Sequence, residues 1–120
     1  MPENELIKSL KDLILENISD EQFGVSDLAE KAGMSRSTLL RKMQKETGKP
    51  ASQFIKDVRL EESKKLIQES DLTISEIGFK VGFNSTSYFI KCFKEAYGIS
   101  PGEYQKQDPP AFQEVKLLDA

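Results

Sequence analysis

The feature that most constrains this chain is an internal repeat about fifty residues long. Residues 26–35 (SDLAEKAGMS) align with residues 75–84 (SEIGFKVGFN) at an offset of 49. Beyond them an offset of 50 applies, so one residue is inserted between Asn84 and Phe89. The offset of 50 aligns Leu39 with Phe89, Arg41 with Lys91, Met43 with Phe93, Gly48 with Gly98 and Phe54 with Tyr104. The repeat predicts two copies of one small unit, each too short to bury a sufficient core alone.

Hydrophobic residues recur at three- and four-residue steps along almost the whole chain, which is typical of amphipathic helices. No stretch alternates like a strand, so we expect an all-α fold of about seven helices. The expected helices cover about residues 4–19, 25–32, 35–48, 50–70, 73–82 and 84–98, with a short last one from Pro101. The predicted N-caps are Ser35, then Asp71 or Thr73, then Asn84, and the predicted stops are Gly33, Gly48, Gly82 and Gly98.

The long fourth helix changes its apolar face midway. Residues 54, 55 and 58 centre on one direction, whereas residues 60, 66 and 67 centre roughly 150° away. A connector between two lobes on opposite sides would show this pattern. We therefore expect one domain over residues 5–106, with a first unit at about 25–48, a linker helix at about 50–70, a second unit at about 73–98, and an acidic tail at 107–120.

Composition excludes several classes of function. The 120 residues include no histidine, which removes Ser-His-Asp and Cys-His catalysis and histidine metal sites. We expect no enzyme activity, no cofactor and no metal, because no phosphate-binding loop or paired-carboxylate site stands out. Cys92 is the single cysteine, so no internal disulfide can form, and we expect it to be a small buried hydrophobe rather than a redox sensor. No apolar run is long enough to cross a membrane, and we expect a cytoplasmic protein.

The charge is unevenly distributed. The net charge is −3, yet residues 22–106 carry +3 and both flanks are acidic. The segment 35–50 contains five cations against the single acid Glu46: Arg36, Arg41, Lys42, Lys45 and Lys49. Such a patch suits a polyanion, although a charged helix face is often only solvated.

Each unit contains a small residue, a glycine four positions later, and an apolar residue after that. These are Ala29, Gly33 and Leu39 in the first unit, and Gly78, Gly82 and Phe89 in the second. The small residue permits two helices to cross closely, and the glycine permits the positive φ of a tight turn. The pattern resembles a helix-turn-helix, and its repetition strengthens that interpretation. Phe79, Phe83 and Tyr88 are expected to be core and turn anchors, with Phe89, Phe93 and Ala96 on the buried face of the sixth helix.

The second helix of each unit leaves a matching stripe of residues unburied. With Leu39 taken as the buried direction, the stripe of the first unit lies roughly opposite and comprises Ser37, Leu40, Arg41 and Gln44. The counterpart in the second unit comprises Ser87, Ile90, Lys91 and Lys94. Serine, an aliphatic residue and a cation can contact base edges, a thymine methyl and guanine in a major groove. Ser35 and Asn84 begin these helices, where backbone N–H groups can bind a phosphate, and Arg36 and Lys45 are further candidate contacts from the basic segment.

The sequence resembles the AraC/XylS transcription regulators. The signature is TISEIGFKVGFN at residues 73–84, followed by Ser87-Tyr88-Phe89, Lys91, Phe93-Lys94, Tyr97-Gly98 and Ser100-Pro101. The first unit matches the family pattern more loosely. The linker helix matches it through Arg59-Leu60. Two departures are Lys49-Pro50 in place of Ser-Pro, and Ser63 where the family often has alanine; both concern packing. The resemblance implies two helix-turn-helix units joined by a long helix, and it places base-reading residues on the two stripes.

These observations predict sequence-specific binding of double-stranded DNA and transcription regulation, with two recognition helices in successive major grooves. The implied partners are DNA, RNA polymerase, and a sensor or receiver module that this chain does not contain. The alternative is a helical protein-interaction module that has kept the scaffold without DNA binding, which the acidic balance and the apolar Leu40 and Ile90 favour a little. Salt-dependent binding to duplex DNA separates the two.

Overall fold

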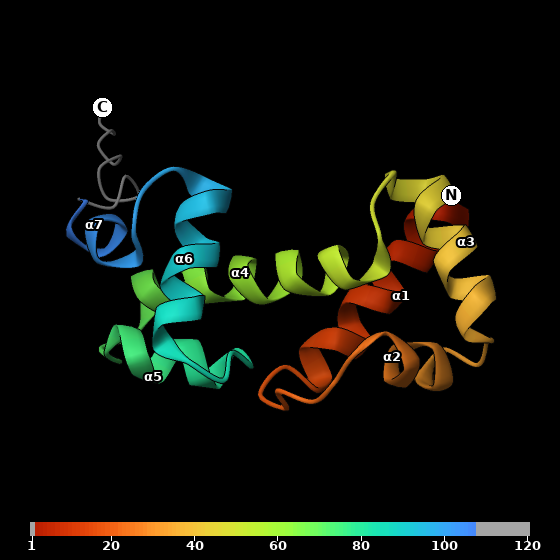
Figure 1. The fold of residues 1–120 in the computed structure, drawn as a ribbon, viewed down its shortest axis with the longest axis horizontal. Helices are drawn as coiled ribbons and strands as arrows, with labels where there is room; N and C mark the ends of the chain where they lie inside the picture. Colours follow the sequence, from red (N-terminus) through yellow and green to blue (C-terminus); the bar gives the residue numbers. More distant parts are fainter. Residues whose placement is uncertain (1, 108–120) are drawn as a thin grey trace.

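The computed structural model describes residues 2–107, with side chains from Glu5 onward, and this part of the chain contains seven α-helices and no strand (Figure 1). The predicted all-α class is confirmed. The helices are α1 (Pro2–Glu16), α2 (Val25–Lys31), α3 (Arg36–Thr47), α4 (Ala51–Glu69), α5 (Ile74–Lys80), α6 (Thr86–Tyr97) and α7 (Pro101–Lys106). The predicted acidic tail lies outside the described residues, apart from Gln107.

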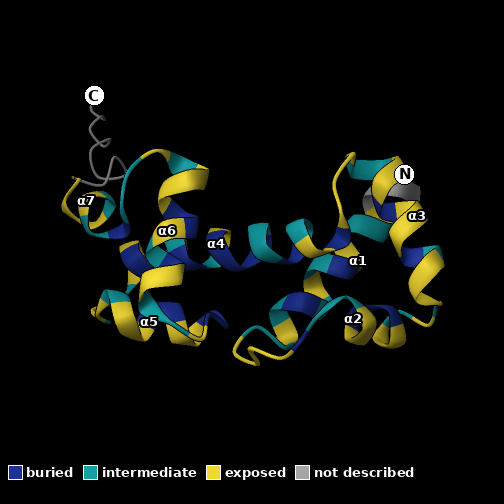
Figure 2. Ribbon diagram, in the orientation of Figure 1, coloured by how far each residue is buried: buried dark blue, intermediate teal, exposed yellow. Residues whose placement is uncertain are grey.

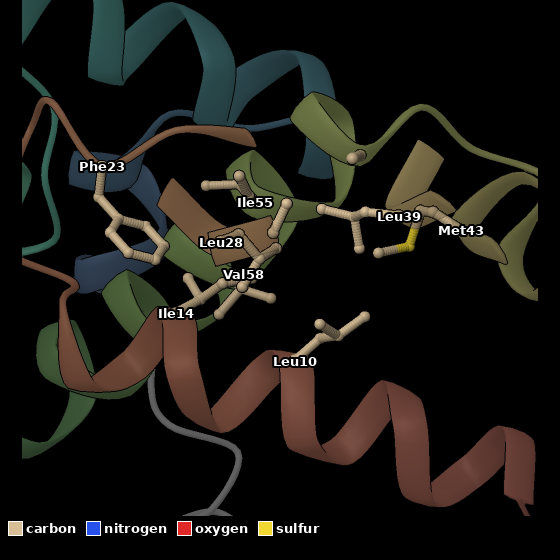
Figure 3. Packing of buried hydrophobic residues seen from close by; sticks show 10 residues of the cluster. Leu10, Ile14, Phe23, Leu28, Leu39, Met43, Ile55 and Val58 are labelled. Carbon is tan, nitrogen blue, oxygen red and sulfur yellow. The ribbon is translucent and has the colours of Figure 1, made fainter. Parts of the chain in front are cut away.

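Two groups of helices lie at opposite ends of α4 (Figures 1 and 2). Each group has its own hydrophobic core. The first lobe consists of α1, α2, α3 and the first half of α4, and Figure 3 shows Leu10 and Ile14 of α1 facing Leu28 and Val58. The second lobe consists of the second half of α4 with α5, α6 and α7, packed around Phe89 and Phe93. Each lobe contains one of the two repeated units.

The predicted change of face along α4 is confirmed. Ile55 and Val58 belong to the core of the first lobe, whereas Leu60 and Ile67 belong to the core of the second. Ser63, also on α4, is fully buried, and its hydroxyl donates a hydrogen bond to the Leu60 carbonyl oxygen at 2.6 Å. The departure at this position is therefore accommodated without an unpaired polar group.

The turns confirm most of the predicted caps and correct one. Ser35 caps α3, with its Oγ accepting a hydrogen bond from the Thr38 amide, and Thr73 caps α5 in the same way. Asn84 does not cap α6: the cap is Ser85, whose Oγ accepts from the Tyr88 amide. Both residue types cap helices well, so the inserted residue could be placed on either side of the cap. The structure places it in the turn, and Ser85 is the counterpart of Ser35.

Close helix packing explains the small residues of the repeat. A Cβ built on Gly78 of α5 would lie 2.8 Å from the ring of Phe89, so any larger residue there would force the Phe89 side chain to shift. Phe83 is buried as expected, but Phe79 and Tyr88 are 53% and 46% exposed, so their prediction as core anchors is wrong. Ala96 is also exposed rather than buried. Fewer apolar residues of α5 and α6 are therefore buried than the number of apolar residues in these helices suggests.

Candidate nucleic-acid interface

The recognition stripe of the first unit is fully open on α3. Ser37, Arg41 and Gln44 are exposed, and Leu40 is 39% exposed although the adjacent Leu39 is completely buried. A single exposed leucine is ordinary on a protein surface, so Leu40 gains significance only from its place in a stripe that the second unit repeats. The structure thus brings the four predicted residues together on one accessible side of α3. Figure 2 shows that much of α3 is exposed.

The stripe of the second unit lies on α6 and is less open. Ser87, Lys91 and Lys94 are exposed, whereas Ile90 is half-buried. Tyr88, which the sequence interpretation assigned to the core, is exposed beside this stripe. Its ring centroid is 5.9 Å from that of Phe83 and 5.9 Å from the Lys56 Nζ, so one edge of the ring packs on the lobe and the other meets solvent.

Both recognition helices are anchored to the preceding helix by equivalent hydrogen bonds. In the first unit the Arg36 Nη1 donates to the Ser26 Oγ at 3.0 Å, and in the second the Thr86 Oγ1 donates to the Ser75 Oγ at 3.0 Å. Arg36 and Thr86 occupy the first position of their helices. The sequence interpretation missed Thr86, because it aligned Asn84 rather than Ser85 with Ser35. Asn84 itself is exposed in the turn.

The cations of the two units differ in how far nearby carboxylates neutralise them. Among residues 5–107, no ion pair involves the α3 cations Arg41, Lys42 and Lys45. On α6, the Lys91 Nζ lies 3.9 Å from the Glu95 carboxylate. Lys49, counted with the basic segment, is held by Asp57 at 2.7 Å and contributes less than the charge count implies. The first unit therefore presents the stronger uncompensated positive surface.

Other classes of site are not found within the described residues. No cluster of three or more side chains there is arranged to bind a metal ion, and none of the seven helices is long and apolar enough to cross a membrane. Cys92 is 3% exposed among apolar side chains, which confirms that it is a small buried hydrophobe.

Comparison with known proteins gives the family. A helix-turn-helix domain family matches residues 28–107, which begin within α2 and include the rest of the first unit, the linker helix and the whole second unit. An AraC-type DNA-binding protein from Chromobacterium violaceum has the same fold, with 28% identity, a TM-score of 0.78, and coverage of 84% of this chain and 89% of that one. This chain belongs to the AraC family. The matched domain is the DNA-binding domain of transcription regulators and not a catalytic domain, and the predicted class of function, sequence-specific DNA binding, is confirmed.

Two further matches bear on partners. The DNA-binding domain of AdpA, a global transcriptional factor solved in complex with a target DNA, has a TM-score of 0.74 at 27% identity and covers 93% of this chain and 96% of that one. A protein named histidine kinase P4 from Formosa agariphila is 32% identical over 105 residues, which is 88% of this chain and 8% of the kinase. The chain spans 28% to 35% of the length of seven other curated relatives.

Proposed function

We propose that this AraC-type domain reads duplex DNA with α3 and α6 inserted into successive major grooves on one side of the duplex. The observation that carries the proposal is the repeated stripe, exposed except for the half-buried Ile90, on two helices of the lobes that form at opposite ends of one linker. At 1.5 Å per residue the 19 residues of α4 extend about 28 Å. This length approaches the roughly 34 Å repeat of B-DNA, so both helices can meet the same face of the duplex.

The individual contacts follow from the chemistry of each side chain. Arg41 has the planar fork that pairs with guanine O6 and N7, and Lys91 brings a flexible point charge to the equivalent place. Leu40 and Ile90 can meet a thymine methyl, and the amide of Gln44 can pair with adenine. The remaining proposed contacts are to phosphates or to either base edge: Ser35, Arg36, Ser37, Lys45, Asn84, Ser87 and Lys94.

Regulation of transcription would follow from where the bound domain lies. A domain bound beside a promoter either recruits RNA polymerase or excludes it. A sensor or receiver module would set when binding occurs; the similarity to a small part of a protein named as a histidine kinase supports this partner. The place of action is the cytoplasm, where bacterial DNA lies.

The second candidate function is a protein-interaction module on the same scaffold. Exposed apolar side chains on the helices favour it, namely Leu40, Phe79 and Tyr88. They are spread over both lobes, whereas a protein interface of ordinary strength has a contiguous apolar centre.

Titration of a fluorescent duplex selected from a random pool separates these two functions. DNA reading predicts affinity that falls steeply with salt, and a loss of binding in the Arg41→Ala variant. The matched control is Lys8→Ala, which removes an exposed cation that lies on α1, outside both stripes, and is paired with Asp12. Affinity that does not depend on salt, or equal losses in both variants, would favour the interaction module.

A further inference from the structure

One buried side chain connects the two lobes across the middle of the molecule. Arg59 lies on α4 where the helix changes face, and it is only 6% exposed. Its Nη1 donates hydrogen bonds to the carbonyl oxygens of Ile18 and Val81, at 2.6 and 2.7 Å. Its Nη2 donates to the carbonyl oxygens of Asp20 and Phe23, both at 3.1 Å. Hydrogen bonds from a charged group are stronger and more directional than neutral ones.

The four acceptors belong to different lobes. Residues 18, 20 and 23 lie in the loop between α1 and α2, which leads into the first helix-turn-helix unit. Val81 is the C-cap residue that follows α5, and it begins the turn of the second unit. Ile18 also packs against both hydrophobic cores. The guanidinium thus ties the entrance of one unit to the turn of the other.

Gly82 makes this connection possible. Its φ of +99° favours glycine, and a Cβ there would overlap the Arg59 guanidinium and lie 2.5 Å from the Ile18 carbonyl oxygen. Gly33, its counterpart in the first unit, has a similar φ of +75° but no atom within 4 Å of a Cβ. The two glycines therefore share a turn conformation, and only Gly82 is also needed for the approach of the two lobes.

We infer that Arg59 and Gly82 form an inter-lobe clamp that fixes the angle between the two recognition helices, and that this clamp sets the spacing of the two DNA blocks that the domain accepts. The inference rests on the proposed reading of DNA by both units. A movement of one helix by roughly 3.4 Å is one base-pair step, so even a small rotation of a lobe changes the preferred spacing. Arg59 is a positioning residue, because it is buried and cannot itself touch DNA.

The first test measures affinity for duplexes in which the two selected blocks are separated by 9, 10, 11 or 12 base pairs. We expect the unaltered domain to prefer one spacing by about tenfold, and Arg59→Met to reduce that preference to about twofold. Binding to a duplex with one block should change little in this variant, since neither reading helix is altered. Arg59→Lys, which keeps the charge but not the planar fork, should flatten the preference partly. If the Arg59→Met variant does not fold at low temperature, the Arg59→Lys variant is used in its place.

Gly82→Ala and Gly33→Ala form the matched pair. Both introduce a side chain at a positive φ, but only Gly82→Ala enters the clamp. We expect the spacing preference to flatten in Gly82→Ala and to persist in Gly33→Ala, with circular dichroism confirming that each is folded at the temperature of the assay. Equal flattening in both would assign the effect to general destabilisation and overturn the inference.

The second test needs no DNA. Spin labels at Lys31→Cys and Lys80→Cys, equivalent exposed positions at the ends of α2 and α5, report the distance between the lobes in a Cys92→Ala background. We expect one narrow distance distribution for the intact clamp and a broader one for Arg59→Met or Arg59→Lys. A narrow distribution and an unchanged spacing preference in folded clamp variants would refute the clamp. If the unaltered domain binds no duplex, the proposed function fails, while the label distances still decide whether the clamp exists.

Discussion

The Arg41→Ala substitution should weaken binding to the selected duplex more than Lys91→Ala does, because the two cations are in different electrostatic environments. Arg41 is exposed on α3 and has no ion-pair partner among residues 5–107. The Lys91 ammonium lies 3.9 Å from the Glu95 carboxylate, with side chains 67% and 64% exposed. A lysine that must leave this partner gains less from DNA than an arginine that has none.

The size of each loss can be estimated. A bidentate contact of arginine with guanine contributes about 1–3 kcal/mol of discrimination, so Arg41→Ala should lower affinity by about five- to 150-fold and relax the preference at one base pair. An exposed pair such as Lys91 with Glu95 is worth about 0.3–0.5 kcal/mol, which offsets part of what Lys91 gains from DNA. Lys91→Ala should then cost less than about 1 kcal/mol, or roughly fivefold. Glu95→Gln should tighten binding slightly, by about twofold.

Fluorescence anisotropy on the selected duplex and on a scrambled one measures all three variants at a single salt concentration. Lys8→Ala is the control for loss of a surface cation. The reasoning is refuted if Lys91→Ala loses more affinity than Arg41→Ala, or if Glu95→Gln weakens binding. The fit of the second unit to DNA, rather than free charge, would then control affinity.

Three further predictions concern the salt dependence, the core and the pH dependence. The slope of log affinity against log salt should be about −4 to −6, and Lys45→Ala should reduce its size by about one while weakening all duplexes alike; equal slopes would show that Lys45 contacts no phosphate. Leu39→Ala should lower the free energy of unfolding by about 2–5 kcal/mol in chemical denaturation, because Leu39 is fully buried, and a loss under 1 kcal/mol would contradict the packing described. Burial, with the nearby Glu61 and Asp57 carboxylates, raises the pKa of Tyr97 to about 12. The stability linked to this proton is therefore present below pH 10 and lost as the pH rises toward 12, whereas a tyrosine absorbance titration complete by pH 11 would contradict it.

The sequence predicted the architecture well because its strongest signals are local or repeated. Glycine stops, serine and threonine caps and the periodicity of apolar residues act within one or two turns of helix. The change of apolar face along α4 is predictable because it is also a local signal. Ile55 and Leu60 lie on the same helix, and their angular separation follows from their positions.

The failures have physical causes. Phe79 and Tyr88 are exposed because each helix buries only one narrow side, and residue type alone does not say which aromatic rings fit there. The sequence predicts Asn84 as the cap in place of Ser85 because asparagine and serine satisfy the same backbone donors. The clamp at Arg59 could not be foreseen, since an arginine on a helix is usually exposed and its acceptors come from segments 22 to 41 residues away.

Selection of bound sequences from random duplexes, followed by footprinting, tests the central claim most directly. Two reading helices predict a protected site of roughly 15–20 base pairs with two base-specific blocks centred about 10 base pairs apart. Arg41→Ala should relax one block and Lys91→Ala the other, because each residue lies on its own recognition helix. A selected site with a single short block would show that only one unit reads bases, and the recovery of no preferred sequence would contradict the account as a whole.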